Sequence, residues 1–271
     1  LRHECYQDML TVSIVTYHTP VDELETCLAS LTSRCISQIY IVDNGSEDKL
    51  RRWAGQHDRV VYIAADNPGF GAGHNLAIRR ALDAGADYHL VLNSDVYFRP
   101  AVIDNIYSFM EAKPGVGMLQ PRITNPDGTM QYTCRRLPTP LDVFGRRFLP
   151  KFLIRRRNDR YLLKHLDFSV PHNIPYHQGS FMFIRTSALR QAGLFDERFF
   201  MYPEDIDLTR RIHRHYKTLY YPGVSIVHAH RAASYHNLRM TVIHAVNLAR
   251  YFCKWGWFYD PERRHFNSAI R

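Results

Sequence analysis

Three carboxylates stand close together near the end of segment 199–207, which reads Phe-Phe-Met-Tyr-Pro-Glu-Asp-Ile-Asp. Acidic residues at a helix start commonly cap free N–H groups and complement the helix dipole, which is a purely structural role. Aromatic neighbours can also desolvate a carboxylate and raise its pKa toward that of a working general base. Glu204 and Asp205, directly after the aromatic residues and a proline, are therefore candidates for removing a proton from an attacking hydroxyl.

A second group of polar residues follows an apolar run that is typical of a buried strand. Asn93, Ser94 and Asp95 come directly after Leu-Val-Leu at 90–92. Ligands of open α/β sheets bind at the carboxyl ends of the strands, and divalent ions that bridge diphosphates prefer oxygen ligands. Asp95 is thus a candidate metal ligand. Asp43, at the end of another expected strand, is a candidate for base or ribose, although Asp-Asn-Gly is also ordinary turn chemistry.

A second metal ligand is available from histidine. His228 ends the apolar run 224–227, and His230 lies on the same strand face two residues later. Imidazole suits manganese better than magnesium or calcium. The chain has 15 histidines, so a structural role for His228 is an equal alternative.

The segment 67–75 carries glycines at positions 69, 71 and 73 before a helical pattern. Such glycines allow close backbone approach, and a helix start offers N–H groups to phosphate. The segment therefore suits a pyrophosphate. A dinucleotide fingerprint would follow the first strand, whereas this loop follows the third, which argues against nicotinamide or flavin binding.

The elements that position these residues alternate between strands and helices in the first 120 residues. Apolar β-rich runs predict buried strands, and two amphipathic patterns predict helices at 20–31 and 73–82. This alternation is typical of a mostly parallel sheet flanked by helices. The expected strands lie at 11–16, 38–42, 59–63 and 88–92.

The second half shows a different pattern, with shorter strands and a basic segment at 146–164. No linker is visible, so we expect one domain over 1–271. Its nucleotide-binding half covers about 10–120, an acceptor and catalytic half about 121–232, and a C-terminal helical segment about 233–271. Within the second half, the patterns predict strands at 180–184, 218–221 and 224–228 and helices at 204–216 and 234–254.

Composition limits the possible partners. The formal net charge is +9 and 45% of the residues are hydrophobic, which supports a folded core and a polyanionic partner. A nucleic-acid partner is disfavoured, because the basic residues form no recognition module and the carboxylates would repel phosphate. The segment 146–164 and the aromatic segment 251–259 suit an anionic membrane surface, with a solvated loop and core packing as the alternatives. The start of the chain resembles no signal peptide and the five cysteines lack C-x-x-C spacing, so we expect a cytoplasmic protein.

Taken together, the motifs resemble the family 2 glycosyltransferases, which invert the anomeric centre and have the GT-A fold. Within that family they are most similar to the rhamnosyltransferase-like members that build bacterial O-antigen or capsule. The resemblance spans nearly the whole chain, and only the last of its motifs is specific by itself. The motifs are 12–16, 42–46, 67–75, 92–95, 179–182 and 193–207.

The resemblance implies a role for each candidate residue. Asp205 is the expected general base, and Glu204 orients it or the acceptor. Asp95, the last residue of the family's D-x-D motif, and His228 are the expected ligands of Mn²⁺ or Mg²⁺. The residues expected to bind the substrate are Thr16, Asp43, Asn67, Gly69, Asn75, Asn93 and Ser94.

Two departures from the family pattern bear on the metal. Asn93 replaces the first aspartate of the motif, and the segment after His228 lacks an expected glycine, so His228 and His230 both stay open as ligands. We expect transfer of L-rhamnose from a dTDP donor to a glycan or lipid-linked glycan on the inner face of the bacterial plasma membrane. A UDP-hexose or galactofuranose transferase is the alternative.

Overall fold

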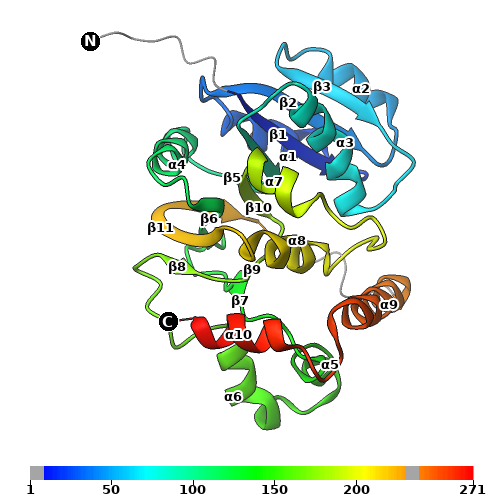
Figure 1. Ribbon diagram of the computed structural model, residues 1–271. Helices are drawn as coiled ribbons and strands as arrows, with labels where there is room; N and C mark the ends of the chain where they lie inside the picture. The colour runs from blue at the N-terminus through cyan, green and yellow to red at the C-terminus, as the bar shows by residue number, and fades with distance from the viewer. Residues whose placement is uncertain (1–8, 230–237, 271) are drawn as a thin grey trace.

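The computed structural model describes residues 9–229 and 238–270, and a single large sheet runs through most of it (Figure 1). Its strand order is β3-β2-β1-β4-β10-β6-β11-β5, with β8 paired to β11. A separate two-stranded ladder joins β7 and β9. The strands are β1 Leu10–Thr16, β2 Ile36–Asp43, β3 Val60–Ala64, β4 Tyr88–Leu92, β5 Val96–Tyr97, β6 Val116–Thr124, β7 Cys134–Arg135, β8 His172–Asn173, β9 Tyr176–His177, β10 Phe181–Arg185 and β11 Lys217–His228.

The first four strands form the expected parallel arrangement. Strand β1 pairs in parallel with both β2 and β4, and β2 pairs in parallel with β3. Parallel neighbours bring their carboxyl ends to one edge, so the ends of β1 and β2 meet there at Thr16 and Asp43. Strand β10 then enters antiparallel between β4 and β6, and β11 runs parallel to β6.

Helices cover both faces of the sheet. They are α1 Val21–Ala29, α2 Asp48–Ala54, α3 Phe70–Asp83, α4 Ala101–Glu111, α5 Pro140–Phe148, α6 Lys151–Tyr161, α7 Thr186–Ala192, α8 Glu204–His213, α9 Leu238–Trp255 and α10 Pro261–Ala269. Side chains of α1, α2 and α4 pack in one core cluster, and side chains of α3, α7 and α8 pack in another.

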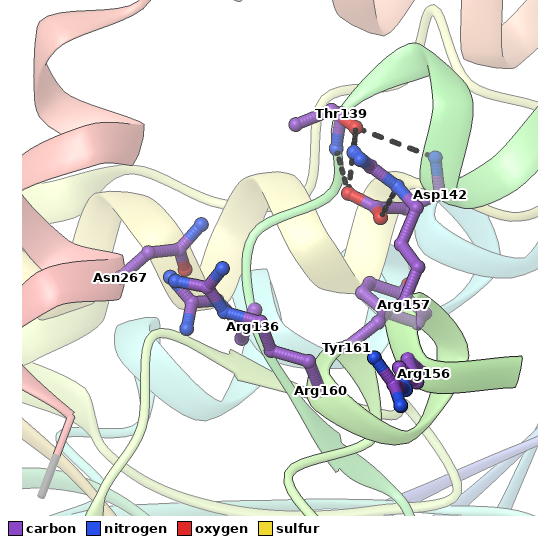
Figure 2. A pocket seen from close by; sticks show the side chains of 8 residues that line it. All are labelled: Arg136, Thr139, Asp142, Arg156, Arg157, Arg160, Tyr161 and Asn267. Carbon is purple, nitrogen blue, oxygen red and sulfur yellow. Dashed lines mark hydrogen bonds and ion pairs between the residues drawn. The ribbon is translucent and has the colours of Figure 1, made fainter. Parts of the chain in front are cut away.

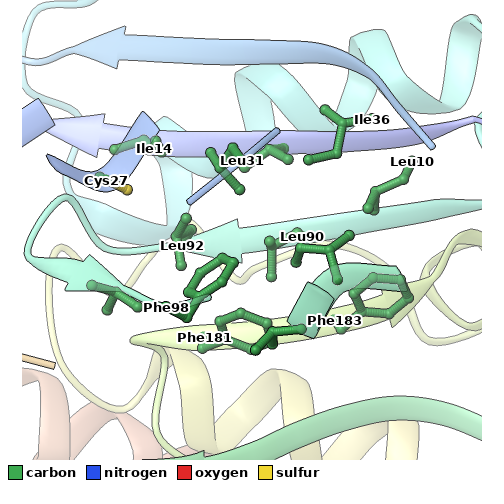
Figure 3. Close-up of a cluster of buried hydrophobic side chains, with 14 of the residues drawn as sticks. Leu10, Ile14, Cys27, Leu31, Ile36, Leu90, Leu92, Phe98, Phe181 and Phe183 are labelled. Atoms are coloured by element: carbon green, nitrogen blue, oxygen red, sulfur yellow. The ribbon is translucent and has the colours of Figure 1, made fainter. Parts of the chain in front are cut away.

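The alternation of residues along the central strands explains why there are two clusters. Leu90 and Leu92 of β4 and Phe181 and Phe183 of β10 belong to the first cluster (Figure 3), whereas Val91 of β4 belongs to the second. Successive residues of a strand point to opposite faces. An all-apolar run such as Leu-Val-Leu is therefore the sequence of a strand that is buried on both sides.

The second half differs from expectation in detail. The two strands expected at 218–221 and 224–228 are one strand, β11, whose pairing with β6 shifts register between Tyr221 and Ser225. The bulge keeps the strand continuous, although the pattern reads as two runs. The helix expected at 204–216 is α8, which ends at His213. Because β6, β10 and β11 join the same sheet as β1–β4, nucleotide and acceptor halves are not separate layers.

Helices α5, α6, α9 and α10 gather beyond the β11 side of the sheet, away from β1–β3 (Figure 1). Arg210 of α8 is almost wholly buried and ties the start of α10 to α8, because its guanidinium makes two hydrogen bonds of 2.6 and 2.7 Å to Asp260 and one of 2.6 Å to Glu262. Such a fork is the strongest form of ion pair. The helix expected from about 234 is described from Leu238 onward, and its earlier residues lie outside the described ranges.

The aromatic segment 251–259 is only partly a surface. Tyr251 and Phe252 are fully buried, whereas Phe258 and Tyr259 are exposed. Core packing therefore accounts for the first part of this segment, and an interface role is open to the last two residues. Within the described ranges, no helix is long and apolar enough to cross a membrane.

Candidate active site

A cleft of about 330 Å³ opens where the carboxyl end of β4 faces the start of α8. Asn93, Ser94 and Asp95 form one side, which with His228 we call the sheet wall. Glu204 and Asp205 form the other, which we call the helix wall. The structure thus brings together candidates that lie more than 100 residues apart in the sequence. The remaining lining residues are Val15, Glu23, Phe70, Gln178, Gly179, Ser180, Met201 and Tyr202.

Strand pairing positions the sheet wall. The short β5 pairs antiparallel with the end of β11, so that His228 lies opposite Val96. The backbone N–H of Ala229 donates to the carbonyl of Asp95 at 2.9 Å. Nε2 of His228 consequently lies 3.3 Å from Oδ1 of Asp95. The two expected metal ligands are neighbours, while the alternative ligand His230 lies outside the described residues.

Gln131 determines which nitrogen of the His228 ring carries the proton. Its side-chain nitrogen donates to the carbonyl of His228 at 2.8 Å and to Oδ1 of Asn125 at 2.7 Å. Its Oε1 lies 3.0 Å from Nδ1 of His228 and can only accept, so Nδ1 is the donor. In a neutral ring Nε2 then has a lone pair facing the carboxylate of Asp95. Two acceptors so close together require a proton or a metal cation between them.

The chemistry of this pair fits a divalent metal. One carboxylate and one imidazole, the latter oriented by an amide behind it, is a common ligand arrangement for transition metals. Across residues 9–229 and 238–270, no group of three or more His, Cys, Asp or Glu side chains could hold an ion by itself. An ion at Asp95 and His228 would therefore need further ligands from outside these groups.

Asp205 on the helix wall is half-buried and held by backbone donors. Its Oδ2 accepts from the N–H of Gly179 at 3.0 Å, and its Oδ1 accepts from the N–H of Ile206 at 2.7 Å. Burial raises the pKa of Asp205 above its usual value, while these two hydrogen bonds and the charge of Arg135 oppose the rise. A carboxylate whose orientation is fixed and whose pKa is raised has the properties of a general base.

Glu204 is the more deeply buried carboxyl. Burial raises its pKa well above the usual value, and the neighbouring charge of Asp205 raises it further. Oε2 of Glu204 is buried without a hydrogen-bond partner among the described residues. These surroundings favour a neutral Glu204 beside an ionised Asp205, because two adjacent carboxylates in a desolvated site do not both ionise readily.

Asp207 points away from the cleft and serves the framework. It is fully buried, and its carboxylate accepts from Arg211 at 2.8 Å, from Lys254 at 2.6 Å and from the indole of Trp255 at 2.8 Å. These contacts tie the first turn of α8 to α9. Asp207 therefore has a structural role, through side-chain contacts rather than by capping backbone N–H groups.

The segment before α8 is fixed by close backbone contacts. The carbonyl of Phe200 accepts from the N–H of Phe70 at 2.9 Å, and a side chain at Gly69 would come within 2.2 Å of that carbonyl. Gly69 also has a φ of 100°, a conformation that glycine adopts without strain. Tyr202 has a φ of 73°, unusual for an aromatic residue. Such local strain is found where a segment is held for function.

The glycine segment packs mainly against the protein itself. A side chain at Gly71 would come within 2.9 Å of Phe195, and one at Gly73 within 3.0 Å of Val15. The close approach that the sequence predicts is thus made by the chain's own residues. Asn75 is buried and exchanges hydrogen bonds with the backbone of Phe195, outside the lining of the cleft.

The other expected nucleotide residues, Thr16, Asp43 and Asn67, are also absent from the lining of the cleft. Asp43 is fully buried and accepts from Gly45, Glu47 and Tyr62 at 2.7–2.9 Å. Thr16 donates weakly to Asp43 at 3.4 Å, and Asn67 accepts from Asn44. These contacts shape the turns after β2 and β3. Donor binding by Thr16, Asp43, Asn67, Gly69 and Asn75 stays a prediction.

Four residues of the site have no motif in the sequence. Glu23 of α1 accepts a hydrogen bond of 2.6 Å from Ser94, and Gln178 lines the cleft. Gln131 orients His228, and the charge of Arg135 acts on Asp205. Gln131 and Gln178 lie in irregular segments, Glu23 lies in α1 and Arg135 in the two-residue β7, and none belongs to a recognisable motif, so only the fold reveals these four.

Comparison with known proteins agrees with this geometry. The family described as "Glycosyl transferase family 2" matches residues 11–193. An N-acetylglucosaminyl-diphospho-decaprenol L-rhamnosyltransferase of Mycobacterium tuberculosis is 34% identical over 84% of this chain and 78% of its own length. The rhamnosyltransferase WbbL of Escherichia coli is 26% identical over 73% of this chain and 75% of its own.

A solved structure supports the fold. The mannosyltransferase PcManGT of Pyrobaculum calidifontis, determined with GDP-Man and Mn²⁺, superposes with a TM-score of 0.62 at 18% identity, over 98% of this chain and 69% of that one. The expected GT-A fold class and the expected enzyme class are confirmed. The family match ends before α8, so the helix wall lies beyond it. On its sequence and its fold, the chain belongs to family 2 of the glycosyltransferases.

Proposed function

We propose that this enzyme transfers L-rhamnose from dTDP-rhamnose, with inversion, to a lipid-linked or growing glycan. The observation that supports it most is the cleft, where a carboxylate base faces a carboxylate and imidazole pair across one space. Single displacement at an anomeric carbon requires both a base for the attacking hydroxyl and stabilisation of the leaving diphosphate. The relatives' names favour rhamnose and a lipid diphosphate acceptor.

In this proposal Asp205 receives the proton of the acceptor hydroxyl. The N–H groups of Gly179 and Ile206 hold its carboxylate in place, and Glu204, neutral beside it, leaves the single negative charge on Asp205. Tyr202 and Met201 line the same side of the cleft. The hydroxyl thereby becomes a nucleophile toward the anomeric carbon on the face opposite the nucleotide.

Asp95 and His228 would hold a divalent ion, Mn²⁺ or Mg²⁺. The ion, when bound, neutralises charge that develops on the leaving diphosphate. Gln131 keeps Nε2 of His228 available as a ligand, and Asn93 and Ser94 lie beside the same site.

The proposed location is the inner face of the bacterial plasma membrane, with the protein bound peripherally. A lipid-linked acceptor would require the cleft to work near a bilayer surface. Exposed apolar side chains at Phe152, Leu153, Phe258 and Tyr259 are available for that contact.

Product analysis tests the proposed function. The enzyme is incubated with dTDP-rhamnose, UDP-glucose, UDP-galactose or UDP-galactofuranose and a lipid diphosphate-linked N-acetylglucosamine, and the anomeric configuration of the product is determined by NMR. We expect turnover with dTDP-rhamnose and an inverted linkage. Turnover with a UDP-sugar and not with dTDP-rhamnose would show that the donor is that UDP-sugar. A retained configuration would contradict the single displacement at Asp205.

A further inference from the structure

A second pocket, of about 380 Å³, lies outside the catalytic cleft among α5, α6 and α10 (Figure 2). Four of its lining residues are arginines, and one is an acid. We call it the arginine pocket. It is lined by Arg136, Thr139, Asp142, Arg156, Arg157, Arg160, Tyr161 and Asn267.

Only one of the four guanidinium groups forms an ion pair with another residue that lines the pocket. Arg157 contacts Asp142 at 2.7 Å and donates to the hydroxyl of Thr139 at 2.6 Å (Figure 2). Arg136, Arg156 and Arg160 form no ion pair within the part of the chain that the structure describes. The pKa of Arg136 is lowered, first by burial and then by the charge of Arg160. The pocket thus gathers four arginines around one carboxylate, that of Asp142, whose charge also acts on Arg136.

Apolar side chains stand beside this charge. Phe152 and Leu153 of α6 are 77% and 64% exposed. They precede Arg156 and Arg157 by four residues each, so each apolar residue lies on the same helix face as an arginine. Arginine next to exposed aromatic and aliphatic groups is the combination that binds lipid phosphates at the surface of a bilayer.

The arginine pocket is connected to the catalytic cleft through β7. The backbone N–H of Arg136 donates to the carbonyl of Tyr161 at 3.1 Å. Arg135, the preceding residue, places its guanidinium 6.0 Å from the ring of the same tyrosine and acts electrostatically on Asp205. Arg135 and Arg136 are thus adjacent residues, of which one acts on the helix wall and the other lines the arginine pocket.

We propose that the arginine pocket binds the phosphate group of a membrane lipid. Guanidinium groups bind phosphate through paired charge-assisted hydrogen bonds, and an excess of four arginines over one carboxylate favours a ligand with more than one negative charge. The lipid is either the diphosphate-linked acceptor or an anionic phospholipid, and both present the same chemistry. The acceptor alternative rests on the proposed function, whereas phosphate binding by itself does not.

The test measures binding without any sugar donor. Inorganic pyrophosphate is titrated by calorimetry in the presence of EDTA, so that a metal in the catalytic cleft does not contribute. Vesicle flotation then uses phosphatidylcholine alone, with phosphatidylglycerol, or with undecaprenyl diphosphate. The variants are Arg156→Glu/Arg160→Glu and, as a control on the donor side, Arg52→Glu, which is also an exposed arginine.

We expect the double variant to bind pyrophosphate at least about tenfold more weakly, because two charge-assisted contacts are lost. The control binds like the wild type. Loss of flotation only with undecaprenyl diphosphate assigns the pocket to the acceptor, and loss only with phosphatidylglycerol assigns it to phospholipid. Phe152→Ser weakens flotation while leaving pyrophosphate binding unchanged.

Wild-type affinity of the double variant for pyrophosphate and for both anionic vesicles would overturn the proposal. An equal loss in Arg52→Glu would overturn it too, since general charge would then explain the binding. The proposed function fails separately, if the wild-type enzyme turns over none of the nucleotide sugars. That result would leave the binding data unaffected.

Discussion

The sheet wall and the helix wall of the cleft both present an aspartate, but in opposite surroundings. Asp95 faces an imidazole nitrogen 3.3 Å away, in a position that calls for a cation. Asp205 forms no ion pair with any described residue, although the charge of Arg135 acts on it, and burial raises its pKa. Aspartate thus serves two purposes in one site. A charged wall suits a diphosphate and its metal, and a desolvated wall suits a proton.

A third aspartate, Asp207, is two residues from Asp205 and does neither. Its carboxylate is fully buried in contacts with Arg211, Lys254 and Trp255. The direction in which each side chain leaves the helix thus separates catalysis from structure within one turn. Substitutions on each wall should therefore have separate effects.

The largest expected effect is on the helix wall. Asp205→Asn removes the proton acceptor but retains the shape, so transfer should fall on the order of a thousandfold. The measurement is the initial rate of product formation. Asp83→Asn, the same change at an exposed helix end, is the matched control and should keep full activity. A near-normal rate in Asp205→Asn would remove this residue from the base role.

On the sheet wall, Asp95→Asn should lower transfer about a hundredfold, because the leaving diphosphate loses a metal held in place. Raising Mn²⁺ should restore part of the rate in this variant and none in Asp205→Asn. The rate is measured over a Mn²⁺ titration. Wild-type activity in EDTA would show instead that the sheet wall works without a metal.

A smaller effect is expected behind the sheet wall. Gln131→Leu removes the acceptor for Nδ1 of His228 and frees the ring to adopt the other tautomer. Loss of such an outer partner commonly costs roughly tenfold to a hundredfold in metal affinity. The Mn²⁺ concentration for half-maximal rate should rise while the rate at saturating Mn²⁺ stays near wild type. An unchanged Mn²⁺ requirement would show that the ring needs no orientation by Gln131.

The smallest effect is a shift in pH dependence. The charge of Arg135 lowers the pKa of Asp205, so Arg135→Gln should raise that pKa. A base works when deprotonated, and activity should therefore recover at a higher pH in the variant, with less than about a tenfold change at pH 8. Arg52→Gln is the control for lost surface charge. A shift of the acid limb to lower pH would have the wrong sign.

Unfolding must be measured alongside, because His89 is buried with a pKa lowered to about 3. Its usual pKa is 6.5, so the unfolded chain binds this proton first as the pH falls. Stability is therefore present above pH 6.5 and is lost below it, by about 1.4 kcal/mol per pH unit for each such group. Urea unfolding at each pH separates this loss from protonation of Asp205.

Much of the site could be predicted from the sequence because its residues follow recognisable strands or start a helix. The run before Asn93 predicts the sheet wall, since parallel strands end at one sheet edge, and the aromatic segment before Glu204 marks the helix start that forms the helix wall. The sequence of the glycine segment does not show what the glycines at 69, 71 and 73 approach. Gly69 meets Phe200, 131 residues away in the sequence, and only the fold shows that this contact is within the protein.

The remaining residues depend on contacts that no local pattern contains. Gln131 and His228 are separated by 97 residues, and an amide side chain has no periodicity that identifies it as a partner. The sequence of the basic segment suits a solvated loop or a membrane surface, whereas in the structure much of the segment lies in α5 and α6. Its arginines form a pocket only because Arg136 and Asn267 come to them from elsewhere.

The division of labour between the two walls is tested most directly by nucleotide affinity. The Kd of dTDP is measured by calorimetry with and without Mn²⁺ for the wild type, Asp95→Asn and Asp205→Asn. We expect Mn²⁺ to strengthen binding of dTDP to the wild type and to Asp205→Asn alike, and Asp95→Asn to lose this gain. Loss of the Mn²⁺ effect in Asp205→Asn, or its retention in Asp95→Asn, would contradict it.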